Sequence, residues 1–287
     1  MRIKLLLCFI LGTSVVQAQD ELLDILNSTA PDKGAYAIAT FKSTRLINGH
    51  SIETRTKQVL EFVISHRFGR VNSGVDELFG LDNSSIRFGL EYGITNNLNV
   101  GMGRSSFNKV YDGFVKYKFL RQSNTSPLTI TGLITAATQT LDFPDNGAAF
   151  ESKHRWAYTY QALLARKFSS DFSLQLMPTL IHRNLVPTEQ DSNDLLALGI
   201  GGRYKLNQRL AINAEYYHQL SDKSDGFTNA IAIGFDIETG GHVFQLHVTN
   251  AQQMNERGFI GETTGDFFEG DIHFGFNISR VFNIGKH

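Results

Sequence analysis

The stretch Gly270-Asp-Ile-His-Phe-Gly-Phe-Asn-Ile-Ser-Arg-Val-Phe282, near the C-terminus, decides the fold class of this chain. Apolar side chains alternate with polar or small ones along it: Ile272, Phe274, Phe276 and Ile278 against His273, Gly275, Asn277 and Ser279. A period of two gives a β-strand one apolar and one polar face. The stretch is also as long as a tilted membrane-spanning strand. We interpret it as the closing strand of an outer-membrane barrel.

The N-terminus indicates export. Residues 1–18 contain Arg2 and Lys4, then an apolar run, then Val16-Gln17-Ala18, which is the pattern of a cleaved signal peptide. The only cysteine, Cys8, lies within this peptide, so we expect the mature chain to have neither disulfide nor thiolate metal site. Without Arg2 and Lys4 the net charge is about −3, which argues against a nucleic-acid partner.

The alternating pattern recurs through the mature chain, and no run of 18 apolar residues follows residue 18. Because only helices and closed barrels satisfy their backbone in lipid, we predict an all-β, antiparallel, up-and-down transmembrane barrel over residues 57–287, with outer-membrane lipid as its partner. The expected strands number twelve: residues 57–68, 83–94, 98–103, 111–119, 128–138, 155–168, 172–183, 195–206, 209–218, 229–237, 242–250 and 271–282.

The expected connections alternate in length, which is typical of barrels with short periplasmic turns and long extracellular loops. The short ones are 95–97, 168–171, 206–209 and 238–241, and the long ones are 141–153, 184–194, 221–228 and 251–270. Counting back from the last strand leaves residues 19–56 outside the barrel wall. We expect these residues to form a periplasmic segment or a segment inside the lumen. A strand hidden in residues 251–270 would instead give fourteen strands.

Two stretches carry a resemblance to a known family: Phe41-Lys-Ser-Thr-Arg-Leu-Ile-Asn-Gly-His50 and Gly234-Phe-Asp-Ile-Glu-Thr-Gly-Gly-His-Val-Phe-Gln-Leu-His247. Together with the closing strand, they resemble an uncharacterised outer-membrane β-barrel family of Bacteroidota, a domain of unknown function. The resemblance covers essentially the whole mature chain. It implies an outer-membrane barrel and transfers no activity, cofactor or catalytic residue.

The alternation places a set of titratable side chains on the inner face of the barrel. They are Glu61, Arg67, Arg87, Glu91, Asp112, Lys116, Lys118, Arg203, Lys205, Glu215, His247 and His273. Basic groups outnumber acidic ones, so a solvated lumen would favour anionic solutes. Paired, the same groups would form a salt-bridged core. Inward glycines leave room for a solute or for the N-terminal segment: Gly89, Gly93, Gly101, Gly103, Gly199 and Gly201.

Neither the histidines nor the carboxylates of the expected external loops indicate a catalytic or metal site. The acidic pairs Asp142 with Asp145 and Asp191 with Asp194 are expected to be solvated. His247 and His273 are expected on neighbouring strands and both inward, but two histidines without a third ligand fall short of a metal site. We expect them to make hydrogen bonds in the lumen, and we expect no cofactor. No strand contains the His-x-Ser arrangement that would place a histidine and a serine on one face, so we predict that the protein is not an enzyme.

These features favour a passive channel or transport-associated barrel for small solutes. A non-conducting barrel that serves as anchor or partner for another envelope protein is the alternative, and a barrel enzyme is a third. The solute, the state of the lumen and the place of residues 19–56 are left open by the sequence.

Overall fold

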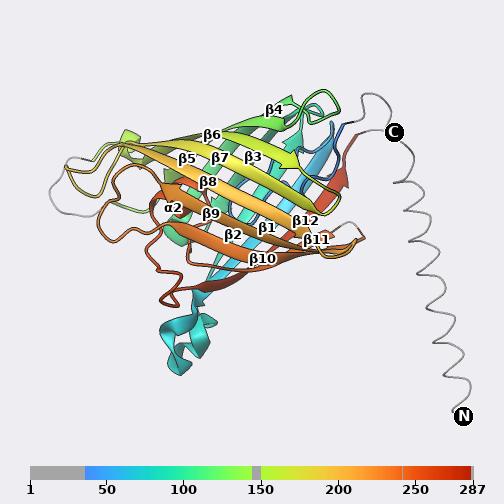
Figure 1. The fold of residues 1–287 in the computed structure, drawn as a ribbon. Helices are drawn as coiled ribbons and strands as arrows, with labels where there is room; N and C mark the ends of the chain where they lie inside the picture. The colour runs from blue at the N-terminus through green and yellow to red at the C-terminus, as the bar shows by residue number, and fades with distance from the viewer. Residues whose placement is uncertain (1–35, 144–149, 241, 286–287) are drawn as a thin grey trace, which may run out of the picture.

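The computed structural model describes residues 36–143, 150–240 and 242–285. The predicted signal peptide and residues 19–35 lie outside the described residues. Twelve antiparallel strands pair in chain order, and β1 pairs with β12 to close the barrel (Figure 1). They are β1 (Val59–Arg70), β2 (Ser84–Gly93), β3 (Leu98–Ser105), β4 (Val110–Leu120), β5 (Thr129–Gln139), β6 (Trp156–Lys167), β7 (Phe172–Arg183), β8 (Asp194–Lys205), β9 (Leu210–Gln219), β10 (Ala230–Thr239), β11 (His242–Thr249) and β12 (His273–Asn283).

The predicted all-β barrel of twelve strands is therefore confirmed. The fourteen-strand alternative is wrong, because residues 251–270 contain the short helix α2 (Glu256–Gly261) and no strand. Four 3-10 turns complete the described elements: η1 (Val71–Ser73), η2 (Val75–Gly80), η3 (Phe107–Lys109) and η4 (Ser152–Arg155). Within the described part of the chain, no helix is both long and apolar enough to cross a membrane.

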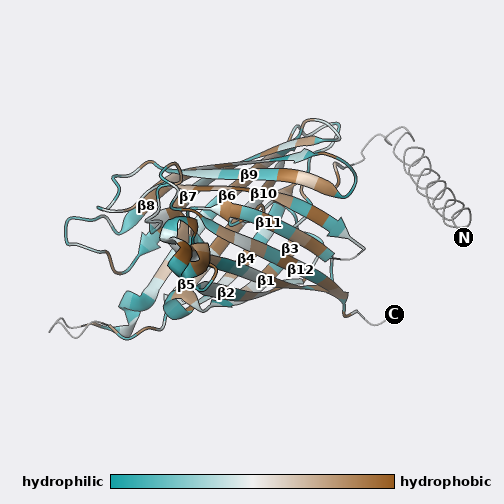
Figure 2. Cartoon of the chain, turned by 90° about the horizontal axis from the view of Figure 1, so that it is seen from below, coloured by the Kyte–Doolittle hydropathy of each residue, from teal (hydrophilic) through white to brown (hydrophobic). Residues whose placement is uncertain are grey.

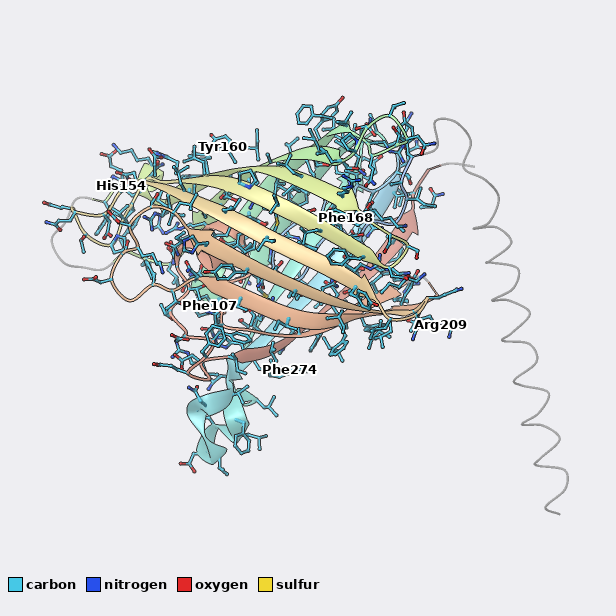
Figure 3. The ribbon with its side chains drawn as sticks, viewed as in Figure 1. Phe107, His154, Tyr160, Phe168, Arg209 and Phe274 are labelled. Carbon is cyan, nitrogen blue, oxygen red and sulfur yellow. The ribbon has the colours of Figure 1, made fainter. Side chains whose placement is uncertain are left out.

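The two faces of the wall differ as the alternation predicts. At the closure, Ser65 of β1 lies opposite Asn277 of β12 and both are buried, while Ile64 lies opposite Ile278 on the outer face. Figure 2 shows apolar and polar residues alternating along the strands. Figure 3 shows Tyr160 and Phe274 pointing away from the barrel. A side chain's place in the period of two thus decides whether it meets the lumen or the outside.

Aromatic rings gather on the outer face at both ends of β6. Trp156 and Tyr158 stack with ring centroids 6.4 Å apart at one end. Phe168 and Phe172 pack 5.7 Å apart across the turn at the other end. Such paired belts are typical of barrels whose two rims lie at membrane–water interfaces.

The barrel has a short-turn end and a long-loop end, defined by connections such as 94–97 and 206–209 on one side and 71–83 and 184–193 on the other. Two connections depart from this rule. Residues 106–109 form a short link at the long-loop end, and residues 121–128 form a longer link at the short-turn end. The longer link receives the chain before β1, because the backbone N–H of Ala37 donates to the carbonyl of Gln122 at 2.8 Å.

Residues 40–53, here called the plug segment, lie inside the barrel and are buried except at Lys42 and Glu53, which are half-buried. The segment turns back at Asn48-Gly49, as that dipeptide predicts. The N–H of Leu46 donates to the carbonyl of Gly49 at 2.8 Å, and the N–H of Ser51 donates to Thr44 at 2.9 Å. The plug segment is thus a hairpin-like loop, and both of its ends lie at the short-turn end of the barrel.

Residues 251–263, here called the inward loop, fold into the barrel from the long-loop end and carry α2. The sequence predicted an external loop here, and that prediction is wrong for these residues. The loop folds inward because its apolar side chains are removed from water there. Phe259 and Ile260 are fully buried and belong to a core inside the barrel. That core also contains Leu46 and Ile52 of the plug segment and Met177 of the wall.

Candidate functional site in the barrel lumen

Glu215 of β9 holds the tip of the plug segment. Its carboxylate accepts hydrogen bonds from three consecutive backbone N–H groups, those of Ile47 (3.3 Å), Asn48 (2.7 Å) and Gly49 (3.2 Å). The turn points these groups in one direction, and successive N–H groups of a turn form a concave site for an anion. Glu215 is buried, so this carboxylate, lying against the tip, replaces the water that would otherwise solvate the turn.

Uncharged amides of the wall bind the carbonyls of the same turn. Three side chains donate: Gln175 to His50 (2.8 Å), Gln245 to Leu46 (2.7 Å) and Asn277 to Ile47 (2.9 Å). The Oε1 of Gln175 also accepts from the N–H of Ile52 at 2.9 Å. Because the plug segment pairs with no strand of the wall, these side chains satisfy backbone groups that a β-ladder would otherwise satisfy.

Some of the predicted lumen charges pair within the wall. Arg87 of β2 binds the carboxylate of Asp112 of β4 through two nitrogens. The Nζ of Lys116 lies 3.1 Å from Glu91, and all four groups are buried. These pairs neutralise their members without any contribution from the plug segment.

Other lumen charges bind the N-terminal chain. Glu61 accepts from Arg55 at 2.6 and 2.8 Å and from the hydroxyl of Thr44 at 2.8 Å. Arg203 donates to the carbonyls of Ala39 (3.0 Å) and Thr40 (3.3 Å). Further contacts to this part of the chain are Arg67 to Asn48, Lys118 to Glu53 at 4.0 Å, and Lys42 to Glu238.

The plug segment and the inward loop meet at a buried ion pair. Nη1 of Arg45 lies 3.0 Å from Oε1 of Glu256 and also donates to the carbonyl of Asn48 at 3.0 Å. The ring of His50 lies 3.6 Å from the same carboxylate and packs edge-on against Phe114, with centroids 4.5 Å apart. The lumen is thus occupied from both ends in the described structure.

Eleven of the twelve inward residues that the sequence singles out are buried at 9% exposure or less. Lys205 lies on the same face of β8 as Arg203 but is only half-buried, because it ends the strand at the short-turn rim. Gln175 and Gln245 were not predicted as site residues, although their positions in the alternation place them inward. Asn277 was predicted on the polar face of the closing strand but without a role. Arg45 and Glu256 were not predicted either, because their pairing depends on how two loops fold.

The two inward histidines are not brought together with further ligands. His273 donates through Nδ1 to the carbonyl of Phe68 at 2.8 Å. Neither ring nitrogen of His247 has a hydrogen-bond partner among the described residues. The same residues contain no group of three or more His, Cys, Asp or Glu side chains that could hold a metal ion.

The inward glycines make room for large side chains and for the plug segment. A Cβ on Gly93 would collide with the backbone of Thr56, and one on Gly201 would lie 2.5 Å from Leu46. A Cβ on Gly89 or Gly103 would collide with Arg87 instead. Gly93 and Gly201 thus make room for the N-terminal chain, which is one of the two predicted uses, whereas Gly89 and Gly103 make room for the wall residue Arg87, which was not predicted.

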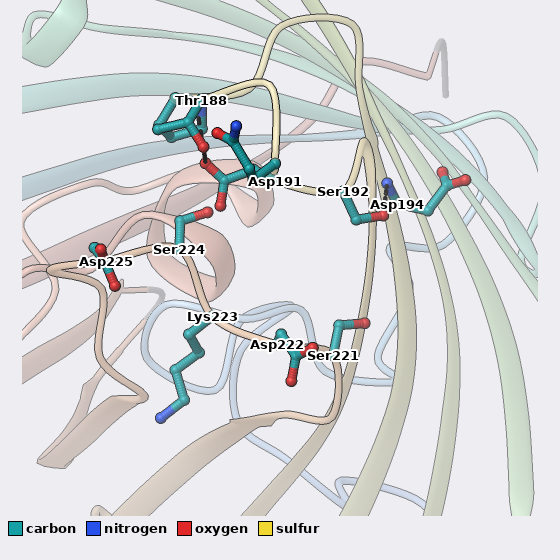
Figure 4. A pocket seen from close by; sticks show the side chains of 11 residues that line it. Thr188, Asp191, Ser192, Asp194, Ser221, Asp222, Lys223, Ser224 and Asp225 are labelled. Carbon is teal, nitrogen blue, oxygen red and sulfur yellow. Dashed lines mark hydrogen bonds between the residues drawn. The ribbon is translucent and has the colours of Figure 1, made fainter.

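A second concave region lies outside the lumen, between the loops that follow β7 and β9 (Figure 4). Its lining is polar and includes Asp191, Asp194, Asp222 and Asp225. Asp191 accepts from the N–H and hydroxyl of Thr188 at 2.9 and 2.8 Å. Hydrogen bonds from Ser224 and Thr188 hold the pKa of Asp191 below its ordinary value. The described contacts are those of a solvated loop surface.

Comparison with known families identifies the barrel. Residues 41–282 match the model described as "Membrane bound beta barrel domain (DUF5777)". The chain belongs to this family. The match includes the plug segment from Phe41 onward, so the family's domain comprises both the wall and its internal hairpin. The predicted origin in Bacteroidota stays a prediction.

Three solved structures are similar to the chain over most of its length. The NanC porin is 11% identical, with 77% of this chain and 98% of that chain covered and a TM-score of 0.47. The KdgM porin is 8% identical, with 78% and 99% covered and a TM-score of 0.48. Omp33 of Acinetobacter baumannii is 8% identical, with 79% and 99% covered and a TM-score of 0.44. A comparison with curated sequences finds no significant match.

Proposed function

We propose that this protein is an outer-membrane channel for small solutes that is closed by its own plug segment. The observation that carries the proposal is the path of the plug segment. The chain enters beside Gln122, which bonds Ala37, and leaves beside Asn96, whose carbonyl accepts from Thr54 at 3.0 Å. Both contacts lie at the short-turn end. The segment can therefore withdraw as a loop, without threading through the barrel.

The family and the sequence together support the membrane and the orientation in this proposal. A membrane-bound barrel with a cleaved signal peptide fits the outer membrane. Short turns face the periplasm in such barrels, so the plug segment would withdraw toward the periplasm. The inward loop would lie on the outer side.

The attachment of the plug segment supports a reversible closure. Its polar contacts are hydrogen bonds and ion pairs to Glu215, Gln175, Gln245, Glu61 and Arg203, and water can replace each of them when the segment leaves. Apolar side chains of the segment, such as Leu46 and Ile52, are buried beside them. A net hydrogen bond in a folded protein contributes only about 0.5–1.5 kcal/mol, because the separated groups bind water. These polar contacts between the plug segment and the wall, here called the polar seam, therefore break at a lower cost in free energy than apolar contacts of the same area.

The experiment compares the mature protein with a variant that lacks residues 19–53, each reconstituted into planar bilayers. We expect rare openings for the mature protein and sustained conductance for the truncated one. A gel assay for heat-dependent mobility confirms that the truncated barrel is folded. A folded truncated barrel without conductance would overturn the proposal.

A disulfide lock tests the closure in the full-length chain, since the mature sequence has no cysteine of its own. Asn48 of the plug segment and Thr249 of β11 touch through their side chains at 3.3 Å. The N48C/T249C variant should conduct only after reduction. The single variant N48C should not respond to reductant and serves as the matched control.

The same recordings report the charge of the open lumen. Withdrawal leaves the wall pairs intact and frees groups of both signs, among them Glu61, Glu215, Arg67, Arg203 and Lys118. We therefore expect a reversal potential near zero in a potassium chloride gradient. A strong anion preference would mean that the acidic groups keep partners in the open state.

A non-conducting barrel is the second candidate, and the filling of the lumen from both ends favours it. In that case the truncated variant would still be closed by the inward loop. A partner protein would copurify with the detergent-solubilised mature protein in a fixed ratio. A channel requires no such partner.

A further inference from the structure

The connection between β1 and β2 stands out from the side of the barrel. It contains η1 and η2, and Figure 1 shows it projecting near the long-loop end, apart from the other loops. Four of its apolar side chains are open to the surroundings: Val75 (73% exposed), Leu78 (51%), Phe79 (51%) and Leu81 (45%). Residues 71–82 are here called the apolar arm. Its exposed apolar side chains need an explanation, because large ones rarely cluster on a water-facing loop.

Backbone contacts at the base of the apolar arm hold it in an ordered conformation. Its base packs backbone to backbone, since a Cβ on Gly69 would lie 2.9 Å from the carbonyl oxygen of Gly80. The N–H of Gly69 donates to the carbonyl of Asn83, and the N–H of Phe79 donates to Gly74, both at 2.8 Å. These contacts hold the projection at a defined angle to the wall.

The tip of the arm adopts an unfavourable backbone. Leu78 and Phe79 have φ of 45° and 55°, in the left-handed region that bulky residues rarely occupy. This conformation leaves both side chains outside any core of the protein. A fold that keeps two large apolar residues in such a conformation indicates that something else covers them.

The arm continues a surface that already faces lipid. On the outer faces of β1 and β12, Phe68 and Phe274 stack with centroids 5.9 Å apart, and His66 stacks on Phe276 at 4.9 Å. Phe68 is three residues before the arm begins. The apolar side chains of the arm therefore extend the lipid-facing aromatic surface outward from the wall at the level of one rim.

We propose that the apolar arm inserts Val75, Leu78 and Phe79 among the acyl chains of the membrane beside the barrel. Asp76, Glu77 and Asp82 interleave with them, so the arm carries polar groups for the headgroup layer as well as apolar groups for the chains. This mixture is typical of short interfacial elements that lie in a leaflet rather than cross it. The arm thus fixes the depth and tilt of this side of the barrel. The proposal does not depend on whether the barrel conducts.

The test uses the single tryptophan of the chain, Trp156, which W156F removes. In that background, F79W places a fluorescent reporter on the arm of the full-length protein. The protein is reconstituted into phosphatidylcholine vesicles with and without brominated acyl chains. We expect a blue-shifted emission for F79W, and the brominated chains should remove most of it.

Matched controls come from the same protein. Phe268 lies in another loop at the long-loop end and is 87% exposed, so F268W in the W156F background should emit as in water and resist quenching. Native Trp156, on the outer face of β6, gives the lipid-facing reference. If F79W behaves like F268W, the proposal is overturned. If its emission is blue-shifted but unquenched by brominated lipid, the arm is covered by protein, and the lipid proposal is likewise overturned.

Discussion

The plug segment and the inward loop fill the same lumen from opposite ends and share one apolar core, yet their backbone hydrogen bonds are made in different ways. The plug segment has no helix and relies on wall side chains for its backbone hydrogen bonds. The inward loop satisfies part of its own backbone through α2, where Asn255 caps the N–H of Gly258 at 3.0 Å. It is fastened by apolar burial of Phe259 and Ile260.

This difference assigns the two inserts different parts in closing the barrel. The polar groups of the plug segment regain water when they leave the wall, so they contribute little to the free energy that opposes withdrawal. The larger contribution comes from Phe41, Leu46, Ile47 and Ile52, which are buried inside the barrel. Exposure of Phe259 and Ile260 would cost the full transfer of apolar surface into water. We regard the plug segment as the mobile insert because both of its ends leave at the short-turn end and wall side chains hold its turn through exchangeable hydrogen bonds. The inward loop, with its own helix, is part of the fixed barrel.

The largest expected effect comes from the fixed insert. Phe259 packs edge-on against Tyr217, with centroids 5.0 Å apart, and is fully buried. F259A leaves a cavity and should lower the free energy of unfolding by about 3–5 kcal/mol. Urea titration of the detergent-solubilised protein, followed by circular dichroism, measures this loss.

Conductance measurements on F259A show whether a less stable barrel is also a more open one. If the inward loop is fixed, F259A should leave the low open probability of the mature protein unchanged. F268A, at an exposed position in the same connection, should stay within about 0.5 kcal/mol of the parent in the titration. A conductance as high as that of the truncated variant would refute the distinction between the two inserts.

A smaller effect is expected at the seam of the mobile insert. In E215Q, one amide oxygen replaces two carboxylate oxygens, and the amide nitrogen meets N–H donors of the turn. Hydrogen bonds to a charged group contribute about 1.5–3 kcal/mol, and we expect a net loss of about 2 kcal/mol in plug binding. Since 1.4 kcal/mol is a factor of ten, single-channel recordings should show an open fraction raised by about thirtyfold.

Glu91 supplies the matched control for this change. It is a buried carboxylate of the same wall, but its partners are Lys116 at 3.1 Å and Asn99 at 2.7 Å, both of the wall. E91Q should destabilise the barrel in the urea titration without raising the open fraction. Equal opening in E215Q and E91Q would show that conductance reports general loosening rather than release of the plug segment.

The local part of this architecture is readable from the sequence. The period of two at Glu61, Arg87 and Glu215 places each side chain on one face, because a strand allows only two directions. The direction of the inward loop is not readable in this way. Phe259 and Ile260 sit in a connection whose length alone favours an external loop, and only the closed barrel offers them an apolar space to fill.

The charged pairs show the same limit. Sequence alternation predicts that Arg67 and Glu215 face the lumen, and both are buried there. It cannot predict that Glu215 binds three backbone N–H groups instead of a cation, because that contact needs the turn at Asn48-Gly49 to reach β9. Which wall residue binds the turn depends on how far residues 40–53 extend into the barrel.

The smallest effect is expected for G201A, which changes the packing of the plug segment against the wall and leaves its polar contacts unchanged. Gly201 and Gly202 are neighbours on β8 that face opposite sides. A Cβ on Gly201 would lie 2.5 Å from Cδ1 of Leu46, which is 1% exposed and has little room to move, whereas a Cβ on Gly202 would make ordinary contacts at 3.5 Å. Overpacking costs about 1–3 kcal/mol, so G201A should favour withdrawal of the plug segment by about 1 kcal/mol, raising the open fraction a few-fold. G202A should leave the open fraction unchanged and, as a Gly-to-Ala change at a compatible site, stabilise the barrel slightly. If G201A opened the barrel no more than G202A, Leu46 would not be pressed against the wall, and its packing there would have no part in closure.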